Sequence, residues 1–426
     1  MDVIIPTDVK FGEKCTITVD LPSDATGNVT LTIDGKKHTA EVKNSTVTLS
    51  IPPLTVGVHN ITTTYSGDSK YDPNTQEGSI TILPNDVIIA ADDVVMLYHD
   101  GTRLVAKLTD TFKNPLTNTS LFFKLNGIVY SRTTDENGSA SMALNLNSGN
   151  YTATIMYFGN SSYNKAEVNV NISINPSIIA HDLVKMYQND TQFYATFLDS
   201  QKNPLAKTNV TFNINGVFYT RETNENGTAK LNINLKPGNY TLTAYNPVTG
   251  EEQGFNVLVK SLILASDLTK YYHNESKFQA TVYNKNGSLA VNQSVTFNIN
   301  GKLYTRPTNE NGTVSLAINL KPGKYIITTM FEGLEVSNIV KVLPTLITGD
   351  LAMSYHDKSK FNATVLDGHG NPLANQTVQF NVNGVIYSKT TGNDGIASLT
   401  INLNKGEYII TSMWNEYQVG NKITIS

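Results

Sequence analysis

The sequence contains a single cysteine, Cys15, among 426 residues. One cysteine cannot form a disulfide within the chain, so packing has to stabilise its cores. Cys15 opens the alternating stretch CTITVDL, and we expect a small buried side chain in a strand there, not a reactive thiol.

Charged residues and long apolar runs are also scarce. Charged side chains make up 16% of the sequence and the formal net charge is −4, so a strongly basic nucleic-acid binder is excluded. No apolar run approaches the roughly 18 residues of a membrane-spanning helix, so we expect no direct membrane insertion by this segment. The start, MDVIIPTDVKFGEK, lacks the basic and apolar parts of a signal peptide. The abrupt ends suggest a piece of a longer protein.

The chain has no convincing helix either, because Gly, Asn and Thr interrupt every candidate window. It has repetition instead. Asn-Gly pairs begin at 126, 215, 300 and 383, with spacings of 89, 85 and 83 residues. Turn glycines and Gly-x-Tyr turns keep step with them. A period in the mid-eighties is too long for most solenoid repeats and has the size of one small β-sandwich.

The strands inside each repeat are legible. NVTFNI places Val210, Phe212 and Ile214 on one side, the period of a strand with one solvated face. Asn-Gly between two such stretches predicts a tight hairpin, because both turn residues need a positive φ. About seven strands per repeat predict a sandwich of two sheets.

The first 84 residues are related to the repeats but differ from them. YSGDSKY from Tyr65 matches YFGNSSY from Tyr157. We therefore predict an all-β fold of five tandem domains, at residues 1–84, 85–175, 176–260, 261–343 and 344–426.

The junctions between these domains are short and apolar, and three carry a proline: Pro84, Pro176 and Pro344. Such junctions predict an extended, semi-rigid array. A compact chain of this length has a radius of gyration of about 22 Å. A rod of domains gives about 45–55 Å instead.

Four motifs carry a family resemblance: D-x-x-x-N-P-L-A, V-T-F-N-I-N-G-V-x-Y, T-x-E-N-G-T-A and L-x-I-N-L-x-P-G-x-Y. They resemble the Ig-like repeats of adhesin-like cell-surface proteins of methanogenic archaea. TTTYSGDSKYDPNT resembles a second, bacterial Ig-like subtype. The resemblance implies Ig-like sandwiches, an extracellular location at the cell surface, and a stalk, spacer or binding role.

Residues suited to catalysis or metal binding lack partners in the sequence. His99, His273 and His356 follow the repeated tyrosine in a polar turn, which favours solvated turn histidines over a general base. DENG from Asp135 has too few ligands for a calcium loop and is interpreted as a turn. We expect no enzyme activity, metal or cofactor.

Autocatalytic Lys–Asn crosslinks need a lysine in the first strand of each domain. We place Lys185 and Lys270 in nearby but different columns, and the second domain has Val95-Met96 there. We therefore expect no crosslink.

Asn-x-Ser/Thr sequons are the densest motif and make the chain a candidate for N-glycosylation. Chance also produces sequons in a sequence rich in Asn and Thr. The candidates are Asn28, Asn44, Asn118, Asn150, Asn209, Asn239, Asn274 and Asn362.

A tyrosine and a basic residue two positions on follow every Asn-Gly turn. The pairs are Tyr130/Arg132, Tyr219/Arg221, Tyr304/Arg306 and Tyr387/Lys389. We expect Val129, Phe218, Leu303 and Ile386 to face inward and the pairs to face outward, where they suit sugar rings or carboxylates. A cation–π ladder that supports the wet sheet face is the competing interpretation.

The only tryptophan, Trp414, lies beside Tyr417 at the last hairpin and is a further candidate ligand contact. Tyr65, Tyr157 and Phe331 hold the same column, which favours a structural aromatic; Asn246 breaks the column.

The sequence thus predicts a non-catalytic extracellular stalk or adhesin segment. The first alternative is a carbohydrate- or protein-binding module that uses the Tyr/Arg stripes or hairpin loops. The second is a set of accessory domains of a surface enzyme. The expected partner is a polysaccharide or protein of another cell surface, and the oligomeric state is left open.

Overall fold

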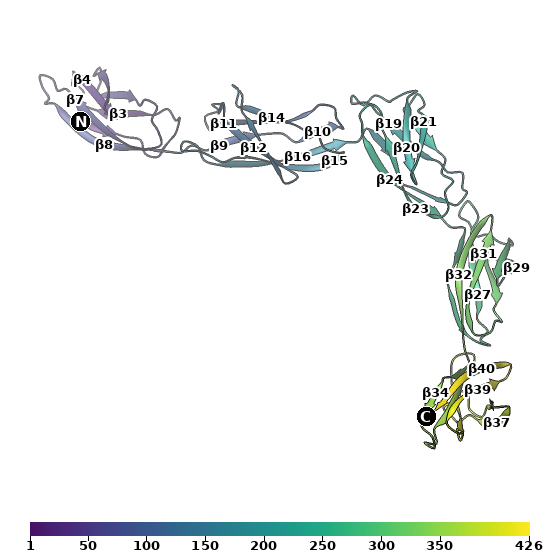
Figure 1. Cartoon of the computed structure of the whole chain (residues 1–426). Helices are drawn as coiled ribbons and strands as arrows, with labels where there is room; N and C mark the ends of the chain where they lie inside the picture. The colour runs from purple at the N-terminus through teal and green to yellow at the C-terminus, as the bar shows by residue number, and fades with distance from the viewer. The chain divides into compact units, whose positions relative to one another are not determined.

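The computed structural model describes all residues, 1–426, and every regular element in it is a β-strand (Figure 1). Ten sheets form five pairs, each with a three-stranded and a five-stranded sheet. No helix that could span a membrane is present. The all-β class predicted from the sequence is confirmed.

The strands follow the repeats. The first sandwich contains β1 (Asp2–Ile4), β2 (Val9–Lys10), β3 (Thr16–Asp20), β4 (Asn28–Ile33), β5 (Lys36–Glu41), β6 (Thr46–Ser50), β7 (Gly57–Tyr65) and β8 (Asn74–Leu83). The second contains β9 (Val87–Ala90), β10 (Val94–Leu97), β11 (Arg103–Asp110), β12 (Ser120–Leu125), β13 (Ile128–Thr133), β14 (Ser139–Ala143), β15 (Gly149–Tyr157) and β16 (Ala166–Asn175).

The other three sandwiches have the same eight elements. The third contains β17 (Ile178–Ala180), β18 (Leu183–Met186), β19 (Phe193–Phe197), β20 (Asn209–Ile214), β21 (Val217–Glu222), β22 (Thr228–Leu231), β23 (Gly238–Tyr245) and β24 (Glu252–Lys260). The fourth contains β25 (Ile263–Ala265), β26 (Leu268–Tyr271), β27 (Lys277–Val282), β28 (Ser294–Ile299), β29 (Lys302–Pro307), β30 (Thr313–Ala317), β31 (Gly323–Phe331) and β32 (Leu334–Leu343). The fifth contains β33 (Leu346–Thr348), β34 (Leu351–Met353), β35 (Lys360–Val365), β36 (Thr377–Val382), β37 (Val385–Thr390), β38 (Ile396–Thr400), β39 (Gly406–Trp414) and β40 (Tyr417–Ile425).

One sheet order recurs in all five sandwiches. In the second, the five-stranded sheet runs β10-β16-β15-β12-β13 and the three-stranded sheet β14-β11-β9. β10 pairs with β16 in parallel, and the remaining pairs of that sheet are antiparallel. The strand after each Asn-Gly turn is therefore always an edge strand. It pairs with one neighbour only.

The chain divides into two compact units. One holds Met1–His181, Tyr194–Leu231 and Thr243–Gly254, and the other holds Asp182–Phe193, Asn232–Leu242 and Phe255–Ser426. The first two sandwiches lie in the first unit and the last two in the second. The predicted domain boundaries and the extended array stay predictions.

The hairpin chemistry matches the sequence. Asn383 and Gly384 have φ values of 51° and 82°, and the three other Asn-Gly turns are alike. Both residues of a two-residue turn with this geometry need positive φ, which Asn and Gly adopt most readily. The Asn-Gly pairs therefore fix the register of four hairpins.

The two sheets of a sandwich meet through apolar side chains. Phe361 and Phe380 are fully buried and pack edge-to-face with their ring centres 5.9 Å apart. The pair Phe278–Phe297 repeats this contact at 5.8 Å. Such pairs contribute more than area burial alone, so they join the two sheets at equivalent positions.

The Gly-x-Tyr turns form a corner bond. Tyr151 donates its hydroxyl hydrogen to the carbonyl oxygen of Asn147 at 2.8 Å, and Tyr408 does the same to Asn404 at 3.0 Å. A tyrosine hydroxyl bonded to backbone a few residues upstream, at the start of a late strand, is a hallmark of the Ig fold.

Candidate functional site

The Tyr/Arg pairs lie on edge strands, and the expected facing of these strands is wrong. Val129 is 49% exposed and Phe218 is 65% exposed, and Leu303 and Ile386 are also exposed. Tyr130 instead packs against the second sandwich's core. The reason is pairing: Tyr130 lies directly opposite Phe123, which is fully buried. Directly opposed residues share a face of the sheet.

The basic residue of the pair turns back onto its own strand. Arg132 donates from a guanidinium nitrogen to the carbonyl oxygen of Ser131 at 2.7 Å. Arg221 and Arg306 make the same bond to Thr220 and Thr305, at 2.7 and 2.8 Å.

Cation–π contacts accompany two of these pairs. The Arg132 guanidinium lies 6.0 Å from the Tyr130 ring centre, and the Arg221 guanidinium lies 5.6 Å from that of Tyr219. In the fourth sandwich the cation over Tyr304 is Lys302, at 5.2 Å. The structure therefore contains cation–π contacts, but they lie within single strands and involve tyrosines such as Tyr130 and Tyr304 that pack against the cores. Ligand contact by these residues stays a prediction.

A depression of about 460 Å³ in the first sandwich is lined by residues that include Cys15. Cys15 is half-buried, whereas the sequence predicted a buried side chain.

One Tyr/Arg pair lines another hollow. A second depression, of about 420 Å³ in the fourth sandwich, is lined by Tyr304 and Arg306 together with Lys277, Ser315 and Asn319. This mixture of an aromatic ring, cations and polar groups suits a sugar or a carboxylate.

The last hairpin places Trp414 inside. Its side chain is 8% exposed and packs in the fifth core, and its Nε1 donates to Oε1 of Gln376 at 3.4 Å. Tyr417 is half-buried, and burial raises the pKa of its hydroxyl. Trp414 therefore has the structural position of its column, and ligand contact by either residue stays a prediction.

The sequons differ in accessibility. Seven of the eight candidate asparagines are exposed: Asn28, Asn44, Asn118, Asn150, Asn209, Asn239 and Asn362. Asn274 is half-buried, and its Nδ2, the atom that would carry a glycan, donates to the carbonyl oxygen of Gly368 at 2.7 Å. Modification of Asn274 would break that bond.

The histidines and the calcium-like motif behave as turns. His99, His273 and His356 have φ values between 55° and 65°. Each ring lies against the preceding tyrosine, stacked for His99 and tilted for the other two. Asp135 accepts hydrogen bonds from the backbone N–H groups of Asn137 and Ser139. The structure contains no group of three or more His, Cys, Asp or Glu side chains that could hold a metal ion.

Lys185 and Lys270 occupy one column, so the interpretation that placed them in different columns is wrong. They pair with Val259 and Val342 at equivalent registers. They are 5% and 6% exposed, and burial lowers the pKa of both amines. Each Nζ donates to a backbone carbonyl, of Ile233 and of Ile318, at 2.9 Å. Met96 and Met353 fill the same position in the second and fifth sandwiches.

The third sandwich contains a buried polar cluster where other sandwiches have an aromatic ring. Asn246 and Glu251 are each 2% exposed, and Ser177 is fully buried. Glu251 accepts from the backbone N–H and the hydroxyl of Ser177, and from Ile178 N–H. Asn246 donates to the Ser177 hydroxyl at 3.0 Å. The break in the aromatic column pointed to this position, but the sequence did not indicate its partners.

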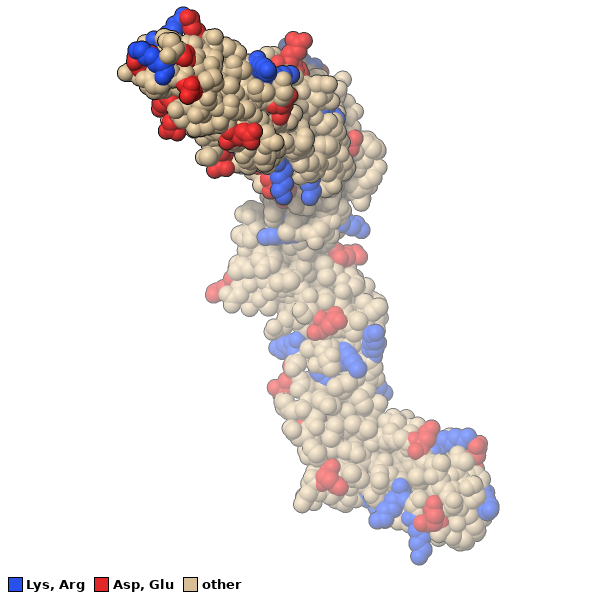
Figure 2. Space-filling view, turned by 90° about the vertical axis from the view of Figure 1, so that its left-hand side faces the viewer, with Lys and Arg blue, Asp and Glu red and all other residues tan.

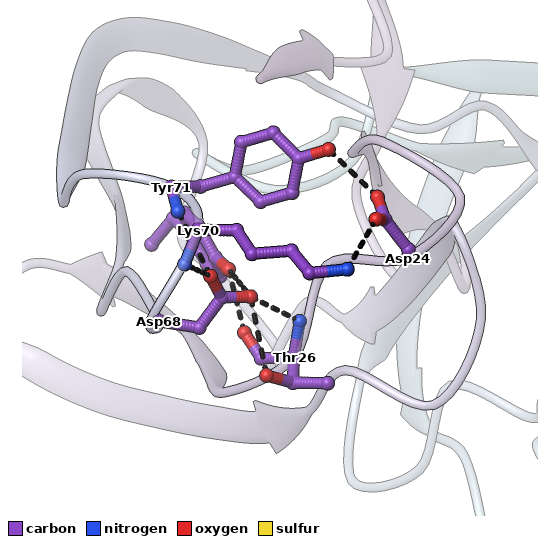
Figure 3. Close-up of polar contacts among 6 residues, drawn as sticks. Asp24, Thr26, Asp68, Lys70 and Tyr71 are labelled. Atoms are coloured by element: carbon purple, nitrogen blue, oxygen red, sulfur yellow. Dashed lines mark hydrogen bonds and ion pairs between the residues drawn. The ribbon is translucent and has the colours of Figure 1, made fainter.

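A polar network in the first sandwich was also missed (Figure 3). Asp68 accepts from Thr26 N–H and from the backbone N–H groups of Lys70 and Tyr71. These bonds, the one from Thr26 first, hold the pKa of Asp68 far below its usual range. Asp24 accepts from the Lys70 ammonium at 2.8 Å and from the Tyr71 hydroxyl at 2.6 Å. The motif YSGDSKY, which contains Asp68, Lys70 and Tyr71, was the sequence feature that could have indicated this network.

The visible charges form no large patch of one sign. Figure 2 shows basic and acidic side chains scattered over a mostly neutral surface. This distribution agrees with the small net charge of the chain.

Comparison with known proteins supports the Ig-like assignment. Residues 3–82 match the family model "Bacterial Ig-like domain (group 3)". The chain is similar to the inverse autotransporter adhesin YeeJ of Escherichia coli (strain K12), with 25% identity over 425 residues. The match covers 83% of this chain and 18% of the relative, so the chain spans less than a fifth of that protein's length.

Two solved structures are also similar. One is invasin, a bacterial integrin-binding protein: 13% identity, 99% of this chain, 98% of that chain, TM-score 0.30. The other is a Ca²⁺-stabilized adhesin with which an Antarctic bacterium reaches out and binds ice: 15% identity, 79% of this chain, 96% of that chain, TM-score 0.20. The archaeal source implied by the sequence resemblance is not supported by these comparisons and stays a prediction.

Proposed function

We propose that this chain is a non-catalytic segment of a cell-surface adhesin, in which Ig-like sandwiches present a contact site or mediate the contact. The supporting observation is the fivefold recurrence of one sheet order. A unit that is repeated with one architecture suits a spacer. The similarity to an adhesin over most of the chain supports the same role.

The finer parts of the proposal follow from this role. The segment is extracellular and lies at the cell surface, and its exposed sequons are accessible to glycosylation. Its partner is a polysaccharide or protein of another cell. A polysaccharide is attractive because Tyr304 lines a hollow together with Arg306, and a tyrosine ring packs well on a sugar.

Small-angle scattering on the full chain tests the stalk. We expect a radius of gyration of about 45–55 Å, because stiff junctions separate the sandwiches. A value near the compact figure of about 22 Å means that the sandwiches fold back on one another, and the stalk proposal is then abandoned.

A binding module is the second candidate function, and the hollow beside Tyr304 and Arg306 favours it. A glycan array with the full chain tests this candidate. We expect a bound glycan to be lost by Tyr304→Ser with Arg306→Ser, and retained by the matched variant Tyr130→Ser with Arg132→Ser. Absence of any bound glycan, or equal loss by both variants, removes the hollow as the binding site.

A further inference from the structure

The strands after the Asn-Gly turns expose backbone groups along one side. In a two-residue hairpin the residues flanking the turn form a hydrogen-bonded pair, and bonded and non-bonded pairs then alternate. Val382 pairs with Val385 across the last turn. The N–H and C=O groups of Val385, Tyr387 and Lys389 therefore point to β36. Those of Ile386, Ser388 and Thr390 point away from the sheet.

Such an edge can pair with another strand, and proteins usually prevent this with charged or otherwise obstructing groups on the edge, which we call a guard. The guanidinium groups described above do this in three sandwiches. Each arginine bonds the carbonyl of the preceding residue, which is one of the outward-pointing carbonyls of β13, β21 or β29. The first sandwich guards β5 differently, with the charges of Lys36, Lys37 and Glu41.

In the fifth sandwich the edge strand is β37 (Figure 1). No arginine of β37 bonds one of its outward-pointing carbonyls, because the strand contains no arginine. Lys389 replaces the arginine, and an ammonium group has no planar fork with which to reach back in the same way. All six residues of β37 are exposed. Val385, Ile386 and Tyr387 are 52%, 57% and 41% exposed. Tyr130 and Tyr304, by contrast, pack against their own cores.

We propose that β37 is a self-association edge that pairs antiparallel with β37 of a second copy of this chain. An edge strand is self-complementary under a two-fold axis. Ser388 opposite Ser388 brings all three outward-pointing residues into hydrogen-bonded pairs, because Ile386 then lies opposite Thr390. Two five-stranded sheets become one sheet across the axis.

Charge and ring chemistry favour the second copy as the occupant. In this register Lys389 lies opposite Tyr387 of the partner strand and never opposite another lysine. A cation facing an aromatic ring is attractive, whereas two cations facing each other destabilise a strand pair. The pairing thus gives Lys389 a cation–π role across the axis, which Arg132 and Arg221 perform within one strand.

Sedimentation equilibrium of the full chain tests the proposal. A contact through one six-residue strand belongs to the small class of interfaces, so we expect weak dimerisation at about 0.1–1 mM. Lys389→Arg adds the guard, and Ile386→Lys adds a charged side chain to the edge strand, a common protection against edge pairing; each should weaken the dimer at least about tenfold. The matched control Leu303→Lys on β29 should leave it unchanged. Lys389 and Ile386 are exposed, so both variants should fold.

Hydrogen exchange locates the contact. Amides of Ile386, Ser388 and Thr390 should exchange more slowly as concentration rises, and those of β29 should not. A chain that stays monomeric at 1 mM overturns the proposal. So does a dimer that resists both β37 variants or that Leu303→Lys dissociates. These outcomes leave the stalk proposal intact, because the radius of gyration of the monomer tests that proposal separately.

Discussion

The third and fifth sandwiches fill one position in opposite ways. In the fifth, Trp414 fills it with a large ring, and one nitrogen bonds Gln376. In the third, Asn246 lies there inside a network with Ser177 and Glu251. Both sites are almost completely buried. The comparison shows that the sandwich needs this position filled and satisfied, and that it accepts either an apolar or a hydrogen-bonded solution.

A similar contrast exists at the buried position on the strand that pairs in parallel with the last strand of each sandwich. Lys185 and Lys270 place an amine where Met96 and Met353 place an apolar side chain. The amines bond only backbone carbonyls. A buried ammonium group that bonds no carboxylate destabilises the folded state. The third and fourth sandwiches should therefore be less stable with lysine at this position than they would be with methionine.

Removing the ring should have the largest effect. Trp414→Ala leaves a cavity in the fifth core, and we expect a loss of about 3–5 kcal/mol in the opening free energy of that sandwich. Hydrogen exchange with mass spectrometry on the full chain measures each sandwich separately. An effect below about 1 kcal/mol would show that the ring is not part of the core.

Removing the carboxylate from the buried polar cluster of the third sandwich should have the second largest effect. Glu251→Ala leaves the buried backbone N–H groups of Ser177 and Ile178 without their carboxylate acceptor, and we expect the third sandwich to lose about 2–4 kcal/mol. The neighbour Glu252 is exposed, so Glu252→Ala is the control and should change little. Equal effects would mean that the network does not stabilise the fold.

Replacing one of the buried lysines by methionine should stabilise the chain. Lys270→Met removes a buried charge and introduces the residue found in the second and fifth sandwiches, so we expect a gain of about 1–2 kcal/mol in the fourth sandwich. Lys277→Met, at an exposed position, should be neutral. A destabilised Lys270→Met variant would instead show that the bond to the Ile318 carbonyl outweighs desolvation.

The pH dependence of the two lysines should be the smallest effect. Burial lowers the folded-state pKa of Lys185 and Lys270 below the unfolded value of 10.5. Between the two pKa values the unfolded chain binds more protons, so these groups make stability rise with pH. Denaturant unfolding from pH 7 to 10.5 compares the chain with the double variant Lys185→Met/Lys270→Met. The difference between their free energies of unfolding should narrow as the pH rises. A difference that widens contradicts the lowered pKa of the two lysines.

Much of this protein followed from its sequence. The Asn-Gly pairs dictated positive φ at both turn residues, and strand alternation with a mid-eighties period dictated a repeated two-sheet sandwich. These features are local: a turn residue's φ preference and the two-residue period of a strand act wherever the strand lies.

Tertiary structure decided which face of an edge strand is covered and which buried groups meet. Alternation along β13 separates Tyr130 from Val129 but does not say which of them faces the core. The hairpin register with the buried Phe123 decides that, and hydrophobicity alone pointed the wrong way. Ser177 lies 69 residues before Asn246 and 74 before Glu251, and only the closed sandwich brings it to them. Long-range packing settles such choices because their free energy depends on the partner and not on the residue alone.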